Sequence, residues 1–285
     1  MVRQVTLPRL FSWPSGNLFK ENQLMRILVF SMALACFSIS QPSRPLEAGT
    51  ATAPVLIEFF TSDGCSSCPP VDVWLQQLEE SQPIPGAQAI LLSEHVDYFD
   101  HDGWKDPYSS PMMTDRQRGY VRALGLKSLY TPQVIVDGKT ELPLNDPQRV
   151  NQLLLKAATA PMVPVRISEI RVEGDSPAIL RTHIEADGAS ENRNAAVFAA
   201  VALGHVETQV STGENGGRHL VHISVVEQLI KIGKLEKGKT FSQDFQTRLK
   251  PGTDPRNLQL IVFVQEQNHG NVLGVALEQI GVSDR

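Results

Sequence analysis

The pattern of hydrophobic and polar positions divides the chain into two halves. In the first half, short apolar runs alternate with segments whose apolar residues recur every three or four positions, which predicts strands alternating with helices. From about Pro161 the period becomes two, and clusters of Gly, Pro, Asn and Asp separate the apolar runs. We therefore expect an α/β domain over residues 51–160 and an antiparallel β-sandwich domain over residues 161–285.

The first half has the predicted order β-α-β-α-β-β-α. Helices are expected to begin after Cys68, at Thr114 as an N-cap, and at Asp146–Pro147. An Asp137–Gly138 hairpin turn joins the last two strands. The four strands are expected over residues 55–60, 89–96, 133–136 and 139–142. The second half adds some seven strands, over residues 165–167, 179–184, 196–201, 219–223, 241–245, 258–264 and 272–277.

The first 50 residues have the pattern of a processed segment. The apolar run 27–39 has the length of a signal-peptide core and falls short of the roughly 20 residues that span a membrane. We expect cleavage before Ala53, which removes Cys36 with residues 1–50. An uncleaved signal anchor and a lipoprotein-type site at Cys36 are the alternatives. The mature protein is thus expected to be exported, periplasmic or secreted, and to touch a membrane only through an uncleaved segment.

The charge of the chain bears on the class of partner that it binds. The formal net charge is −5 and the isoelectric point is near 5.8. The sequence has no basic stripe and no patch that mixes basic and aromatic residues. Nucleic acid is therefore excluded as a main partner.

A pair of cysteines, Cys65 and Cys68, stands where an apolar run ends and a helical pattern begins. The free N–H groups and the dipole at a helix start favour a thiolate over a thiol. A disulfide closing so small a ring would stabilise the fold by only about 2 kcal/mol, so a structural staple explains the pair weakly. No second cysteine pair and no His-x-x-x-His completes a four-ligand zinc site. We favour a redox-active dithiol in which Cys65 attacks and Cys68 resolves the mixed disulfide.

The element order, the Cys-x-x-Cys at the first helix and Thr131–Pro132 before the third strand together resemble the thioredoxin fold. The resemblance implies that Pro132 is cis and faces the dithiol. It also implies that Thr131 offers its backbone to the substrate chain. These two residues would then orient the partner protein.

Glu58 lies in the first predicted strand, and the resemblance places it behind the second cysteine. A buried carboxyl there could accept the proton of Cys68 during exchange. The alternative is a glutamate on the solvent edge of a half-exposed strand. The chain departs from thioredoxin in two ways: one extra residue separates Glu58 from Cys65, and Ser66–Ser67 replaces Gly-Pro.

Several separated motifs look more closely like an exported thioredoxin-like family that is catalogued only as a domain of unknown function. The likeness covers roughly residues 54–285 and brings no established substrate. The motifs are residues 59–70, 95–100, 103–107, 130–133 and 213–218.

An insertion from His95 to Pro111 brings acidic, imidazole and aromatic side chains close together in sequence. It follows a strand whose end should share a rim with the cysteines, so His95, Tyr98 and Trp104 could form a wall that selects a partner peptide. A polar loop held by Asx turns is an equally favoured interpretation of this insertion, and a metal site is the third alternative. The residues that would supply metal ligands are His95, Asp97, Asp100, His101, Asp102 and Asp106.

A β-sandwich by itself implies no catalysis, and the second half adds no clear chemistry. The glycine-rich loop 213–218 lacks the strand–turn–helix context of a phosphate site; we expect it to dock on the first domain and shape the cysteine cleft. The four scattered histidines of this half are interpreted as surface or packed side chains: His205, His219, His222 and His269.

These patterns predict an exported thiol–disulfide oxidoreductase that acts on protein thiols or disulfides and requires no organic cofactor and no metal. The main alternative is a copper(I)-binding or delivery protein that uses the two thiolates and a histidine such as His95. A non-catalytic binding module is the third. The redox prediction requires that a partner can reach the Cys65 sulfur, and that the cysteines lie near Thr131–Pro132.

Overall fold

The computed structural model describes residues 52–101, 103–188 and 195–281. The predicted signal segment and Cys36 lie outside the described residues, as does Asp102 of the insertion. Within the described ranges, no helix combines the length and the apolar character needed to cross a membrane.

The first half folds in the predicted order, with one helix start shifted. The second helix begins three residues before Thr114, with Pro111 in its first turn. Its N-cap is Ser110, whose Oγ accepts a hydrogen bond from the Met112 N–H at 3.2 Å. The elements are β1 (Ala53–Thr61), α1 (Pro69–Ser81), β2 (Ala87–His95), α2 (Pro111–Ala123), β3 (Gln133–Val136), β4 (Thr140–Glu141) and α3 (Pro147–Ala157).

All seven strands predicted for the second half are present, and three of them are much longer than predicted: Val165–Glu173, Ala195–Gln209 and His219–Leu235. The last two form a long antiparallel hairpin. The elements are β5 (Val165–Glu173), β6 (Ile179–Ala186), β7 (Ala195–Gln209), β8 (His219–Leu235), β9 (Phe241–Arg248), the short 3-10 helix η1 (Pro255–Asn257), β10 (Leu258–Glu266) and β11 (Val272–Ile280).

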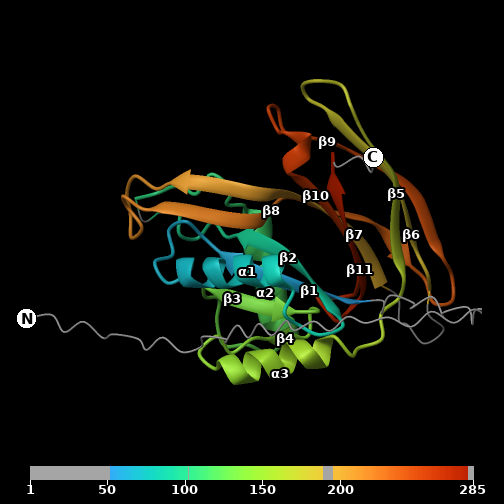
Figure 1. Cartoon of the computed structure of the whole chain (residues 1–285), viewed down its shortest axis with the longest axis horizontal. Coiled ribbons are helices and arrows are strands. Elements are labelled where there is room, and N and C mark those ends of the chain that lie inside the picture. The colour runs from blue at the N-terminus through green and yellow to red at the C-terminus, as the bar shows by residue number, and fades with distance from the viewer. Residues whose placement is uncertain (1–51, 102, 189–194, 282–285) are drawn as a thin grey trace, which may run out of the picture. The chain divides into compact units, whose positions relative to one another are not determined.

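The strands form one large mixed sheet and one small antiparallel sheet (Figure 1). The large sheet has eight strands in the order β11-β10-β7-β8-β2-β1-β3-β4. It is continuous across residue 160 because β8 runs parallel to β2, with Ser93 opposite Val225. Of the seven strands expected in a separate sandwich, only β5, β6 and β9 form their own sheet. The division into domains 51–160 and 161–285 stays a prediction.

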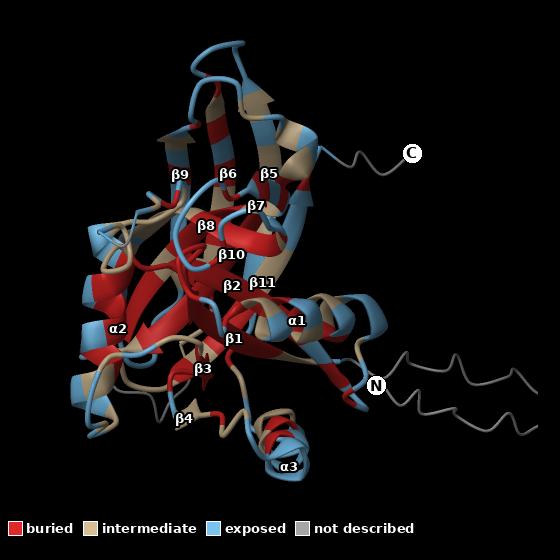
Figure 2. Cartoon of the chain, turned by 90° about the vertical axis from the view of Figure 1, so that its left-hand side faces the viewer, coloured by how far each residue is buried: buried red, intermediate tan, exposed pale blue. Residues whose placement is uncertain are grey.

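Strand β1 lies at the centre of the first half and is buried along most of its length (Figure 2). Because successive side chains of a strand point to opposite faces, Ile57 and Phe59 pack with Leu75 of α1, whereas Phe60 packs with Tyr120 of α2. Helix α3 contributes to the same core as α1. The small sheet packs through a separate core on the β7, β10 and β11 end of the large sheet.

The predicted turn between β3 and β4 packs closely against β1 and against Gly270. Asp137 and Gly138 both have positive φ, of 48° and 63°. The Asp137 Oδ1 accepts a hydrogen bond from the Leu56 N–H at 2.9 Å, which ties the turn to β1. A Cβ on Gly138 would overlap the carbonyl oxygen of Gly270. The turn therefore needs glycine for both its backbone conformation and the space beside it.

We predict that Gly138→Ala lowers the free energy of unfolding by more than about 2 kcal/mol, because a left-handed alanine costs roughly 1–2 kcal/mol and a steric overlap is added. Gly86→Ala is the matched control, because Gly86 also has positive φ but faces open space. Gly86→Ala should lower the free energy of unfolding by about 1 kcal/mol. Urea unfolding of both variants measures the difference, and equal losses would show that the Gly270 contact is unimportant.

Candidate functional site

Cys65 and Cys68 form a disulfide at the start of α1, with their Cα atoms 5.5 Å apart. Cys68 is the N-cap residue of the helix. The Cys65 N–H donates to the Ser62 carbonyl at 3.0 Å, within the turn that follows β1. The pair therefore lies at the predicted junction of strand and helix, next to the positive end of the α1 dipole. Free N–H groups do not add to this effect, because Pro69 and Pro70 carry none and the N–H groups of Val71 and Asp72 donate to the Cys68 carbonyl.

Both cysteines are buried, with 2% of Cys65 and 1% of Cys68 exposed. Ser66 and Ser67 between them are exposed. The requirement that a partner can reach the Cys65 sulfur is therefore not met in this conformation. Any exchange at this disulfide needs a movement that uncovers it.

The Thr131–Pro132 bend lies beside the end of β1. Its peptide bond is cis, as the resemblance implied. The next residue, Gln133, pairs with Phe60 of β1, and Val134 belongs to the same buried core as the two cysteines. The structure thus brings the bend and the cysteine turn to one end of the sheet.

The structure does not bring Glu58 to Cys68. Phe59, the next residue of β1, packs on the cysteine face, so Glu58 points to the opposite face, toward α2. There it accepts a hydrogen bond from Arg116 Nε at 2.5 Å and another from the Tyr120 hydroxyl. The extra residue between Glu58 and the cysteines accounts for this, because a shift of one residue in a strand reverses the face.

Asp63, two residues before the disulfide, uses every polar group it has. Its N–H donates to Asp106 Oδ2 at 2.8 Å and its carbonyl accepts from Asn215 Nδ2 at 2.8 Å. Its carboxylate contacts His222 Nε2 at 2.9 Å and accepts from Trp104 Nε1 at 3.3 Å. One buried residue therefore joins the cysteine turn to the insertion and to the β7–β8 hairpin.

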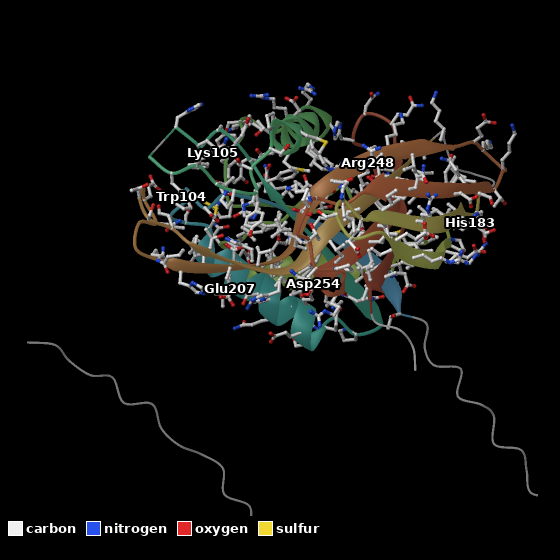
Figure 3. All side chains as sticks on the ribbon, turned by 90° about the horizontal axis from the view of Figure 1, so that it is seen from above. Trp104, Lys105, His183, Glu207, Arg248 and Asp254 are labelled. Carbon is white, nitrogen blue, oxygen red and sulfur yellow. A yellow bond between two sulfur atoms is a disulfide. The ribbon has the colours of Figure 1, made fainter. Side chains whose placement is uncertain are left out.

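The insertion borders the cysteine turn through its aromatic residues. Trp104 reaches Asp63, and Phe99 lies so close to Gly64 that a Cβ at Gly64 would stand 2.9 Å from the Phe99 Cβ. Figure 3 shows Trp104 far from His183, which lies on the small sheet. Tyr98 is half-buried and donates to Gln117 Oε1 at 3.3 Å. The role of Tyr98 and Trp104 in selecting a partner stays a prediction.

His95 is fully buried and faces Asp106 rather than a surface. Its Nδ1 lies 2.7 Å from Asp106 Oδ2. Burial would raise the pKa of Asp106, but the charge and hydrogen bond of His95 and the N–H groups of Asp63 and Tyr108 outweigh burial and lower that pKa to about 2. His95 therefore supports the turn from inside, and a partner peptide cannot touch it in this conformation.

Three of these side chains approach a metal-site geometry: donor atoms of Asp63, His95 and Asp106 lie within 4.8 Å of one another. Each carboxylate already accepts hydrogen bonds from neighbouring side chains or backbone groups. The buried Nε2 of His95 has no hydrogen-bond partner among the described residues. Two other described acids of the insertion, Asp97 and Asp100, are not part of this group. Asp97 accepts from Thr114, and Asp100 accepts from Ser109 and from the Asp106 N–H at 3.3 Å. In the part of the chain that the structure describes, no such group of three donors includes a cysteine.

His222 of β8 is clamped between two carboxylates. Its Nε2 contacts Asp63 Oδ1 at 2.9 Å and its Nδ1 contacts Asp72 Oδ1 of α1 at 2.8 Å. Burial opposes the proton on this imidazole, but the two hydrogen bonds and the two negative charges outweigh it and raise the pKa of His222 to about 10. His222 is therefore a buried imidazolium at neutral pH.

The tip of the β7–β8 hairpin lies against the cysteine turn, as the sequence led us to expect for loop 213–218 (Figure 1). Asn215 is buried, and its Nδ2 donates to the Cys65 carbonyl at 3.0 Å as well as to Asp63. The Ser66 N–H donates to Glu214 Oε2 at 3.2 Å. The Thr212 hydroxyl donates to the Gly103 carbonyl, so the tip also contacts the insertion.

The family DUF1223, described as a protein of unknown function, matches residues 56–265. The chain belongs to the DUF1223 family. No curated protein matches it.

Among solved structures, this DUF1223 protein is similar to protein AGR_C_4864 from Agrobacterium tumefaciens. The two are 23% identical with a TM-score of 0.61, and the match covers 82% of this chain and 97% of that one. This likeness concerns the fold alone. A β-glucosidase from Kluyveromyces marxianus matches 42% of this chain and 14% of its own at 15% identity, with a TM-score of 0.24, and carries no argument.

Sequence reasoning missed four residues of this DUF1223 site. The sequence pattern does not distinguish Asp63 or Asp72, it favours a surface or packed side chain for His222, and it places Asn215 only within a loop motif. One signal was present: Asp63 stands in the strand-to-helix turn itself, two positions before Cys65. The partners of Asp63 are 41 to 159 residues away in sequence, so no local pattern could reveal the network.

We predict that the stabilising effect of the His222 proton depends on pH. The pKa of His222 is about 10 in the fold and near 6.5 in the unfolded chain, so its contribution is complete below about pH 6.5 and is lost as pH rises through about 10. The unfolding free energy of wild type and His222→Gln, measured in urea at pH 6, 8 and 9.5, should therefore converge as pH rises. A difference that stays constant with pH would contradict the buried imidazolium.

Proposed function

We propose that this protein is an exported thiol–disulfide oxidoreductase that acts on protein thiols or disulfides through Cys65 and Cys68. The observation that carries the proposal is the disulfide immediately before α1, with Cys68 as the N-cap, in the turn that follows a central strand. A helix start stabilises the thiolate that forms when this bond is broken. The reaction needs no organic cofactor.

The arrangement of the first half supports a thioredoxin-like fold. The strands follow the order β2-β1-β3-β4, with β1 parallel to β2 and antiparallel to β3. Helices α1 and α3 share one core, whereas α2 packs on the other face of β1. The cis Thr131–Pro132 bond at the cysteine end of this sheet is a further agreement.

In the direction of substrate reduction, the exchange between the dithiol and the partner disulfide has two steps. The Cys65 thiolate attacks a disulfide of the partner, which forms a mixed disulfide and releases one partner thiolate. The Cys68 thiolate then attacks the Cys65 sulfur, which restores the Cys65–Cys68 disulfide and releases the second partner thiolate. Two electrons pass to the partner, and solvent supplies the protons that its thiols take up. The backbone of Thr131, half-buried beside the turn, would hold the partner chain.

Burial of the disulfide requires that a cover opens before exchange. The tip of the β7–β8 hairpin contacts the cysteine turn, through Asn215 on the Cys65 carbonyl and Glu214 on the Ser66 N–H. Such hydrogen bonds each contribute only about 1 kcal/mol net, so the tip can separate without unfolding the sheet. We infer that the tip controls access to the disulfide.

We predict that Asn215→Ala increases the rate constant for disulfide reduction by dithiothreitol about 5- to 30-fold, because it removes two hydrogen bonds worth roughly 1–2 kcal/mol together. Asn257→Ala is the matched control: Asn257 also makes two bonds to backbone groups, both to His205. The control should leave the rate within about twofold. Equal rates in wild type and Asn215→Ala would contradict the cover.

The exchange reaction itself is tested in a Cys36→Ser background, in which the dithiol is the sole source of thiols. The reduced protein should reduce insulin disulfides, and Cys65→Ser should abolish this because the attacking sulfur is lost. Cys68→Ser should instead accumulate a mixed disulfide, because nothing resolves it. Gel shift and mass spectrometry detect the adduct. A reduced protein that exchanges with no disulfide substrate would refute the proposed function.

A further inference from the structure

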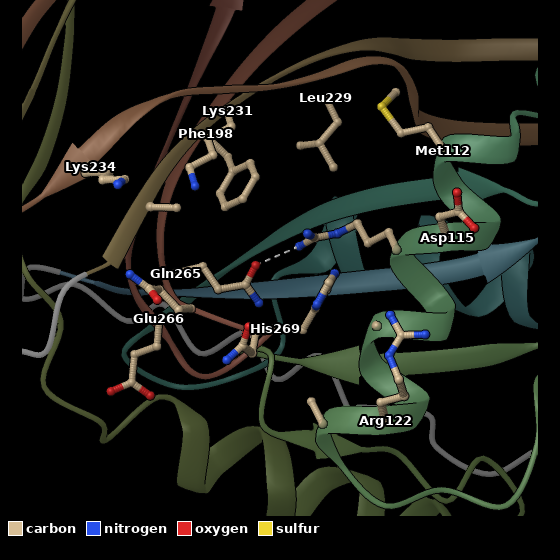
Figure 4. A pocket seen from close by; sticks show the side chains of 16 residues that line it. Met112, Asp115, Arg122, Phe198, Leu229, Lys231, Lys234, Gln265, Glu266 and His269 are labelled. Carbon is tan, nitrogen blue, oxygen red and sulfur yellow. Dashed lines mark hydrogen bonds between the residues drawn. The ribbon is translucent and has the colours of Figure 1, made fainter.

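A second candidate site lies on the face of the large sheet that carries α2, opposite the cysteines. It is a cavity of about 860 Å³ between α2, the β7–β8 hairpin and the end of β10 (Figure 4). Both polar and apolar side chains line it. Nothing in the proposed exchange reaction uses this cavity.

The floor of the cavity holds a buried guanidinium with one free edge. Arg116 donates through Nε to Glu58 at 2.5 Å and through Nη2 to Tyr120 and Gln265 at 3.1 and 3.2 Å. Its Nη1 makes no hydrogen bond with any described residue, and Arg116 lines the cavity. A bound group with acceptor oxygens could complete this guanidinium.

Two buried acids stand behind Arg116. Glu58 pairs with the guanidinium at 2.5 Å and Glu94 at 3.3 Å. Burial and the neighbouring Glu58 raise the pKa of Glu94 well above its usual value, which weakens the negative charge behind the guanidinium.

The wall of the cavity presents the imidazole of His269. His269 and Asn268 both have φ of 58°, because they are the central residues of the turn between β10 and β11. The His269 ring fits only because residue 119 is glycine, since a Cβ there would overlap the imidazole. Glycine inside a helix costs roughly 0.5–1 kcal/mol relative to alanine. Neither ring nitrogen of His269 has a hydrogen-bond partner within the described ranges.

The rim is positively charged and one wall is apolar. Lys231, Lys234 and Arg122 line the cavity and form no ion pair with the described residues. The two acids that line the cavity both have partners. Asp115 forms an ion pair with Arg118 at 2.7 Å, and Glu266 accepts a hydrogen bond from the Asn271 N–H at 3.3 Å. Apolar surface comes from Phe198, Leu229 and Met112, which is 42% exposed.

We propose that this cavity binds a small organic acid with an apolar body. The carboxylate is met by Arg116 Nη1, the imidazole of His269 and the two rim lysines. The apolar body lies along Phe198 and Leu229, where it removes exposed hydrocarbon from water. The proposal does not depend on the exchange reaction of the cysteines.

The test is calorimetric titration of the full chain with octanoate, compared with acetate and 1-octanol. Octanoate should bind with a stoichiometry of one and at least about 10-fold more tightly than either, since only octanoate offers both the charge and the apolar body. His269→Asn should weaken octanoate at least about 5-fold while keeping the turn, because asparagine tolerates positive φ. Gly119→Ala should also weaken it by displacing the imidazole, and circular dichroism checks that both variants fold.

The double variant Lys231→Gln/Lys234→Gln should weaken octanoate about 5-fold or more. Lys105→Gln/Lys237→Gln changes the net charge equally away from the cavity and should stay within about twofold. Octanoate binding no tighter than 1-octanol, or equal weakening by both lysine pairs, would overturn the proposal. Flotation with phosphatidylglycerol vesicles separates a free acid from a membrane lipid: co-flotation that requires His269 would overturn the assignment to a free acid.

Discussion

The structure around the disulfide depends on the complete hydrogen bonding of Asp63. This residue is fully buried, and an unpaired buried carboxylate would cost several kcal/mol. Its partners are supplied by two segments far away in sequence, the insertion and the β7–β8 hairpin. The cysteine turn can therefore take this form only when both segments are in place. The hairpin tip that completes this network is also the cover that we propose for the disulfide.

The alternation of β1 separates two chemical environments. One face holds the disulfide, the buried imidazolium of His222 and the hairpin tip. The other face holds Glu58, Arg116 and the floor of the cavity. A single strand therefore supplies both sites, and a change of one residue in its register would exchange the faces. This separation explains why Glu58 cannot serve the cysteines, although it is as deeply buried as the acid that we expected.

Local patterns predicted much of the fold. The apolar run 55–60, the Asp137–Gly138 turn and the Asp146–Pro147 helix start are each read from a few neighbouring residues, and each is present. The sheet that joins both halves was not predicted, because one parallel bridge between Ser93 and Val225 decides it. The cysteine pair was identified for the same local reason. The contact between Asn215 and the Cys65 carbonyl was not, because Asn215 lies 150 residues further along the chain.

The central claim is that the start of α1 makes Cys65 a reactive thiolate once the disulfide is reduced. The most direct test is the rate of Cys65 alkylation by iodoacetamide between pH 5 and 10, in the reduced protein with Cys36 and Cys68 replaced by serine. The account predicts a titration midpoint clearly below the roughly 8.5 of a free cysteine. A midpoint at or above 8.5 would contradict it.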